Sequence, residues 1–97
     1  MKIGDVVTLN TEMLNCKPGT RGVVFNMYQD FDDPSKKGVQ IIFENGNYDG
    51  FSVTDQELFL EEEHVRYIPF YIRDYKFENV MKVSRDFDKG YWDEIFR

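Results

Sequence analysis

Cysteine and histidine are almost absent from the sequence, which has one residue of each, Cys16 and His64. A single thiol cannot form an internal disulfide, and this favours a reducing compartment. The first residues have no long apolar run of the kind that a signal peptide carries. No stretch of the chain has the length and apolarity needed to cross a bilayer. We therefore expect a cytoplasmic protein that does not associate with a membrane.

Motifs for catalysis and metal binding are also missing. Neither Cys16 nor His64 stands in a pattern that is typical of a nucleophile and its base. The acidic residues 30–33 lack the spacing of a calcium-binding EF-hand loop. We therefore expect a noncatalytic protein with no cofactor, no metal and no catalytic residue.

Positive charge is scarce, because 12 basic residues face 18 acidic residues and the net charge is −6. A protein that neutralises nucleic-acid phosphates needs clustered lysine and arginine side chains. The candidate anion or nucleic-acid site consists of four basic residues in or beside two loops: Lys17, Arg21, Lys36 and Lys37. Ordinary surface charge is the alternative interpretation, so the charge balance disfavours nucleic acid without excluding a local patch.

Core-forming residues are abundant in this short chain. Hydrophobic residues make up 41% of the 97 residues, and aromatic residues make up 16%. A chain of this length forms one domain with one hydrophobic core. We predict a single domain over residues 1–97.

Short runs of β-branched and aromatic residues predict a mainly β fold. The expected strands are 5–9, 21–28, 39–43, 48–53 and 58–60. Asn45 and Gly46 predict a two-residue hairpin turn with positive φ at both positions. Gly22 predicts a bend or bulge at a place where a side chain would clash. Thr54 and Glu57 have the form of a capping box and predict one helical turn before the last strand.

The remaining residues, 64–97, have a different pattern and form an aromatic-rich extension. Residues 65–72 predict an extended segment, because Pro69 disfavours a helix. Apolar residues then recur at spacings of three and four and predict a helix over residues 74–88, with Asp74 as its N-cap and Gly90 after its end. Residues 91–96 fit either a helical turn or an extended tail.

Three segments carry a resemblance to a known family: GDVV at residues 4–7, KPGTRGVV at 17–24 and VQIIFENG at 39–46. Together they resemble the KOW-like motif of SH3-like barrels. They are also similar to small uncharacterised barrel proteins of phages and conjugative elements. The resemblance covers about the first 60 residues. It implies a small five-stranded SH3-like barrel at residues 1–63, followed by a C-terminal helical extension at residues 64–97.

The resemblance implies contact with RNA or protein through the barrel loops, because ribosomal and transcription-factor relatives bind in this way. Those relatives usually carry basic loops, whereas this chain has an acidic loop at Asp30, Asp32 and Asp33. Tyrosine and tryptophan are enriched in protein–protein interfaces, so exposed aromatic side chains indicate a binding surface. The candidate partner-binding residues are Tyr28, Tyr48, Tyr91 and Trp92, with packing in the core as the alternative for most of them.

We therefore expect a noncatalytic protein-interaction module whose partner the sequence does not identify. Two alternatives stay open. One is a KOW-like nucleic-acid or ribosome-associated binding protein, and the other is an acidic DNA mimic or accessory protein of a mobile element. The oligomeric state is also open, because the strand at 39–43 is apolar on both sides. Either the C-terminal extension or a second copy of the chain would cover it.

Overall fold

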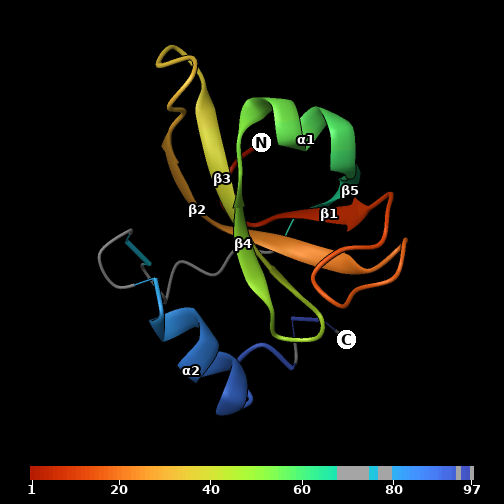
Figure 1. The fold of residues 1–97 in the computed structure, drawn as a ribbon. Helices are drawn as coiled ribbons and strands as arrows, with labels where there is room; N and C mark the ends of the chain where they lie inside the picture. The colour runs from red at the N-terminus through yellow and green to blue at the C-terminus, as the bar shows by residue number, and fades with distance from the viewer. Residues whose placement is uncertain (68–74, 77–79, 94, 97) are drawn as a thin grey trace.

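A computed structural model of the chain describes residues 1–67, 75–76, 80–93 and 95–96, and of residues 63–67 it describes the backbone alone. The described fold is mainly β, as predicted, with five strands and two short helices. All strand pairs are antiparallel, and they form one sheet in the order β4-β3-β2-β1-β5 (Figure 1). The strands are β1 Asp5–Leu9, β2 Arg21–Gln29, β3 Lys37–Phe43, β4 Tyr48–Phe51 and β5 Leu60–Tyr67.

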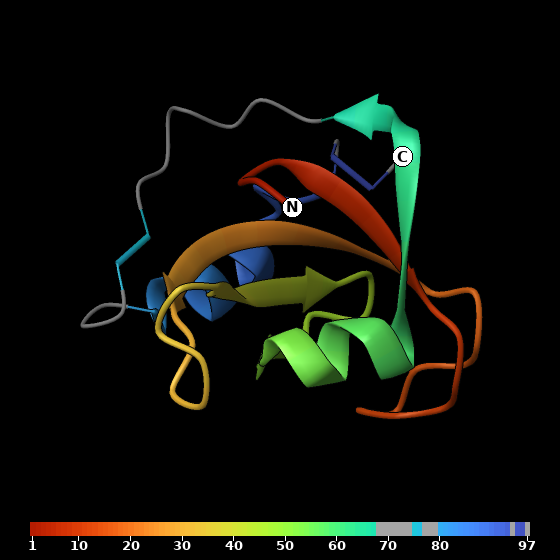
Figure 2. The same cartoon turned by 90° about the horizontal axis from the view of Figure 1, so that it is seen from above.

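The sheet has two open edges among the described residues, because its pairing ends at β4 on one side and at β5 on the other. Helix α1, Val53–Phe59, follows β4 directly and leads into β5. The chain therefore passes from one edge of the sheet to the other through α1 (Figure 2). The number of five strands is confirmed, but the predicted fifth strand at 58–60 is misplaced, because residues 58–59 belong to α1 and β5 runs from Leu60 to Tyr67. Hydrogen-bonded closure into a barrel is not seen in these strands.

Both faces of the central strands are apolar. In the register of β2 with β3, Val24 pairs with Ile41 and Val23 pairs with Ile42. Because side chains alternate between the two faces of a strand, these pairs belong to two different clusters. The inner cluster consists of Val7, Leu9, Cys16, Val24, Val39, Ile41, Phe43, Phe51 and Leu60. The outer cluster consists of Val6, Val23, Phe25, Ile42, Tyr75, Val83 and Trp92.

The outer cluster is completed by the C-terminal residues. Val83 on helix α2, Lys82–Asp88, and Trp92 after it are both 0% exposed. Figure 1 shows α2 against the sheet, on the side away from α1. The chain itself therefore covers the outer face of β3. The sequence left open whether the C-terminal extension or a second copy of the chain would cover this strand. Within the described part of the chain, neither helix has the length and apolarity needed to span a membrane.

Helix α2 ends as the sequence predicts and begins later than predicted. Gly90 has a φ of +86°, its N–H donates to the carbonyl of Phe87, and the N–H of Tyr91 donates to the carbonyl of Asp86. These two bonds form a Schellman motif, which uses the conformational freedom of glycine to end a helix. The helix spans Lys82–Asp88 instead of 74–88, and the predicted N-cap Asp74 lies outside the described residues.

The residues after Gly90 form turns, with the N–H groups of Ile95 and Phe96 both donating to the carbonyl of Trp92. Of the two alternatives for residues 91–96, the helical turn is therefore the closer one in the described part. The predicted extended segment at 65–72 is described as β5 up to Tyr67, and its remainder lies outside the described residues.

Two further local predictions for residues 1–63 are wrong in detail. The side chain that caps α1 belongs to Ser52, whose Oγ accepts the N–H of Asp55, so the helix begins before Thr54 and continues to Phe59. In the hairpin after β3, positive φ occurs at Gly46 and not at Asn45. Phe43 accepts the N–H of Gly46 and donates its own N–H to Asn47, which is the pattern of a three-residue turn with a glycine bulge.

The burial of Trp92 leads to a test of the outer cluster. We expect Trp92→Ala to lower the free energy of unfolding by roughly 3–5 kcal/mol, because a large buried ring is lost and a cavity remains. Urea denaturation measures this difference. Phe31→Ala is the control, because Phe31 is 85% exposed. A loss for Trp92→Ala that equals the control would show that the C-terminal residues do not cover the sheet in solution.

Candidate functional site

Beyond the outer cluster, the outer face of the sheet carries polar side chains in place of apolar ones. Asn26 on β2 pairs with Gln40 on β3, both side chains are 8% exposed, and the Asn26 amide donates to Gln40 Oε1 over 2.8 Å. This hydrogen bond satisfies two polar groups that burial would otherwise penalise. The pair marks the end of the apolar cover, and the next outward residue along β2 is Tyr28.

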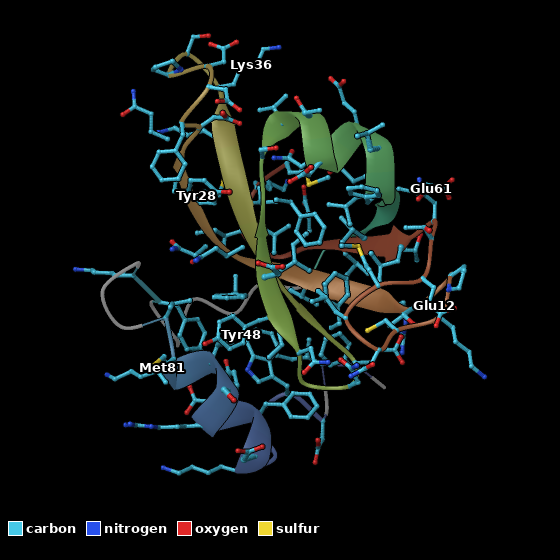
Figure 3. The ribbon with its side chains drawn as sticks, in the orientation of Figure 1. Glu12, Tyr28, Lys36, Tyr48, Glu61 and Met81 are labelled. Atoms are coloured by element: carbon cyan, nitrogen blue, oxygen red, sulfur yellow. The ribbon has the colours of Figure 1, made fainter. Side chains whose placement is uncertain are left out.

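The ring of Tyr28 lies directly on the backbone of the two neighbouring strands. A Cβ built on Gly38 of β3 would stand 2.3 Å from the ring atom Cζ, and one on Gly50 of β4 would stand 3.3 Å from the hydroxyl oxygen. The absence of side chains at both glycines therefore makes room for the ring. Figure 3 shows Tyr28 at this end of the sheet, below the loop that carries Lys36.

Phe31 lies beside Tyr28 and is the most exposed of the large hydrophobic side chains in the described part of the chain, at 85%. The two ring centroids are 5.9 Å apart, and the ring planes meet at 38°. We call Tyr28, Phe31, Gly38 and Gly50 the Tyr28–Phe31 surface. The sequence prediction included Tyr28 and missed Phe31. The signal available was an aromatic residue between aspartates in an otherwise polar loop.

Asp30 ties this loop to the start of α1. One of its carboxylate oxygens accepts the N–H of Val53 over 2.8 Å, and the other accepts the N–H groups of Asp32 over 2.8 Å and Asp33 over 3.2 Å. These backbone bonds, the one from Val53 first, lower the pKa of Asp30 below its ordinary value. Asp30 therefore acts as a structural anchor. In the described residues, no group of three or more histidine, cysteine or acidic side chains is placed to hold a metal.

Negative charge dominates the surroundings of Tyr28. Partial burial raises the pKa of its phenol, and the nearby carboxylates of Asp30, Asp55 and Asp49 raise it further. Lys36 approaches the aspartates of the loop, but its ammonium group is 4.0 Å from the carboxylate of Asp33 and both side chains are half exposed. The surface therefore combines an exposed aromatic ring with an anionic border.

The other predicted partner-binding residues lie elsewhere, around the outer cluster. Trp92 is 0% exposed and therefore has no surface to offer a partner in this state. Tyr91 packs edge-on against it with ring centroids 5.5 Å apart. Tyr48 is partly buried against the same cluster, with its ring 6.1 Å from that of Phe25. For Trp92 the alternative of packing in the core describes the structure, and Tyr28 alone of the four belongs to the Tyr28–Phe31 surface.

The four predicted anion-binding residues do not come together. Arg21 begins β2, and Lys37 pairs with Gln29 at the other end of this nine-residue strand, which is about 26 Å long when extended. Lys36 precedes Lys37, while Lys17 lies in the β1–β2 loop at the Arg21 end. Figure 3 shows the separation through the labels of Glu12 in that loop and Lys36 in the other.

Arg21 is also occupied within the fold. Its Nε donates to Glu44 Oε1 over 2.9 Å, and its guanidinium donates to the carbonyl oxygen of Phe96. It therefore connects the sheet to the C-terminal residues. A phosphate group would have to compete with both partners for this side chain.

Cys16 has the environment of a structural cysteine. It is 3% exposed within the inner cluster, and burial raises the pKa of its thiol. A thiol with a raised pKa stays protonated near neutral pH and is a poor nucleophile. The side chain of His64 lies outside the described residues.

The anchoring role of Asp30 leads to a prediction about acid. Because the folded-state pKa is lowered, the stabilisation is present above the unfolded-state value of about 3.9 and is lost as the pH falls through the folded-state value. Asp30→Asn removes the negative charge and one of the two oxygens that accept backbone N–H groups, so the variant should be less stable than the wild type at pH 7. We expect this difference to shrink below about pH 4. Urea denaturation across pH 3–7 measures it.

Asp32→Asn is the matched control, because Asp32 is an exposed neighbour of the same charge. A difference between wild type and Asp30→Asn that stays constant down to pH 3 would contradict the anchoring role of the carboxylate.

The site is defined by the arrangement of its own residues: a tyrosine held over two glycines, an exposed phenylalanine against it, and a border of carboxylates. Comparisons with protein-family models, with curated proteins and with solved structures found no match.

Proposed function

We propose that the chain is a noncatalytic interaction module on an SH3-like barrel, and that it binds a protein partner through the Tyr28–Phe31 surface. The observation that carries this proposal is the placement of Phe31. Phe31 is 85% exposed, and yet its ring lies beside that of Tyr28, for which Gly38 and Gly50 leave room.

The energetics favour a binding role for such a ring. Covering an exposed aromatic side chain contributes about 1.5–3 kcal/mol of hydrophobic free energy. Ordering a mobile side chain at an interface opposes that gain. Because Tyr28 supports the ring of Phe31, less of this cost remains to be met on binding. Tyrosine and phenylalanine are also enriched in interface cores.

The strand pairing supports the barrel part of the proposal. An SH3-like barrel is a strongly bent five-stranded meander whose first strand also pairs with its last. Here β1 pairs with both β2 and β5, and α1 contacts the edge strands β4 and β5. Gly22, in the segment that resembles the KOW-like motif, also has a packing reason. A Cβ there would stand 2.6 Å from Ile41 Cγ2 and 2.7 Å from Phe43 Cδ1.

The geometry favours this proposal over nucleic-acid binding. The basic residues on which the nucleic-acid alternative depends lie at opposite ends of β2, and Arg21 is bonded to Glu44 and Phe96. A phosphate backbone would also meet the acidic border around Tyr28. The four predicted basic residues therefore do not form a single cationic surface.

An affinity capture from lysate, with the immobilised wild-type protein and the Phe31→Ala variant, tests the proposal. We expect at least one protein that the wild type retains and the variant loses, with nuclease treatment making no difference. Phe31→Ala should fold normally, because an exposed side chain contributes little to stability. Nucleic acid captured equally by both proteins and released by nuclease would contradict the proposal.

A further inference from the structure

The charges around the Tyr28–Phe31 surface are strongly unequal. The carboxylates near it belong to five residues, of which three act electrostatically on Tyr28 and two others follow Phe31 in the loop: Asp30, Asp49, Asp55, Asp32 and Asp33. The basic residues of this region are Lys36 and Lys37. Asp49 and Asp32 are exposed, so their charges remain accessible to a partner.

The chain's own lysines do not neutralise this border. Lys36 and Asp33 are 4.0 Å apart, with side-chain exposures of 56% and 48%. An ion pair that is this long and this exposed contributes little, because water screens it and both side chains lose freedom. A cation of a partner would therefore meet carboxylates that are still available.

We propose that the Tyr28–Phe31 surface binds a cationic segment of a partner protein, in which an arginine or lysine stands beside an apolar side chain. This inference rests on the proposed interaction function and adds the chemistry of the partner. The apolar side chain covers the ring of Phe31, and the cation lies over an aromatic face with the carboxylates around it.

Two attractions act together on such a cation. The face of an aromatic ring attracts an ammonium or guanidinium group within about 6 Å of its centroid. The negatively charged carboxylates beside Tyr28 also attract the cation. Arginine fits best, because its planar guanidinium stacks on rings and binds carboxylates through two parallel hydrogen bonds. An acidic segment would be repelled by the same border.

A peptide library tests the partner chemistry directly. A phage-displayed library of random dodecapeptides is selected on the full-length wild-type protein, and the bound phage are then depleted on immobilised Phe31→Ala. We expect the surviving peptides to be enriched in arginine and lysine and depleted in aspartate and glutamate. The affinity of one such peptide should fall as salt is raised, because exposed charges are screened.

Three variants separate the contributions to the affinity of that peptide. Phe31→Ala should weaken it about tenfold. Gly38→Ala changes no charge, yet its Cβ would displace the Tyr28 ring, from which it would stand 2.3 Å, so it should weaken binding similarly. The double variant Asp49→Asn with Asp55→Asn keeps both rings and should weaken binding of the cationic peptide and reduce its salt dependence, because two of the five carboxylates are lost. Circular dichroism confirms that each variant is folded.

The outcomes distinguish this inference from the proposed function. Phe31-dependent peptides that are neutral or acidic would overturn the cationic partner and leave the interaction surface in place. A library that yields no Phe31-dependent peptide would overturn the surface itself. Concentration-dependent sedimentation of the wild type that Phe31→Ala abolishes would assign the surface to a second copy of this chain and would also overturn the cationic partner.

Discussion

The central constraint on this fold is that β2 and β3 are apolar on both faces. Six of the seven residues of β3 are buried, and Val23 and Val24, adjacent on β2, belong to opposite clusters. One face is covered when the sheet bends over the inner cluster. The other face needs a second layer, which α2 and Trp92 supply. The C-terminal residues are therefore part of the hydrophobic core, and Arg21 strengthens their attachment by donating to the carbonyl of Phe96.

The first four strands were predictable because their signals are local. β1 has the predicted bounds of 5–9, and the predicted strand over 21–28 is one residue shorter than β2. The features that depend on distant partners were not predictable. The hairpin after β3 is an example, because the side chains of Asn45 and Asn47 both donate to the carbonyl of Leu14. The predicted clash at Gly22 is present, but the irregular register lies between Val24 and Asn26.

The same holds for the candidate site: local sequence predicted some of its residues, and contacts between distant segments decide the rest. Aromatic composition pointed to Tyr28, yet exposure depends on the second layer, in which Trp92 is buried and outside which Phe31 lies in solvent. The sequence placed Lys36 and Arg21 near loops, and the length of β2 then separates them. Which residues share a surface depends on the strand register and on which part of the sheet the C-terminal residues cover. Neither follows from the composition of one segment.

Two different regions lie on the outer face of β2: the end at Val23 belongs to the buried outer cluster, and the end at Tyr28 belongs to the Tyr28–Phe31 surface. Between Val23 and Tyr28 the strand advances about 16 Å, and the buried amide pair of Asn26 with Gln40 lies between them. Sites this far apart with no shared partner act almost independently on stability. The outer cluster can therefore hold the fold together while the Tyr28–Phe31 surface varies. An exposed phenylalanine adds little to folding, and its support by Tyr28 over two glycines is the observation on which the proposed contact with a partner rests.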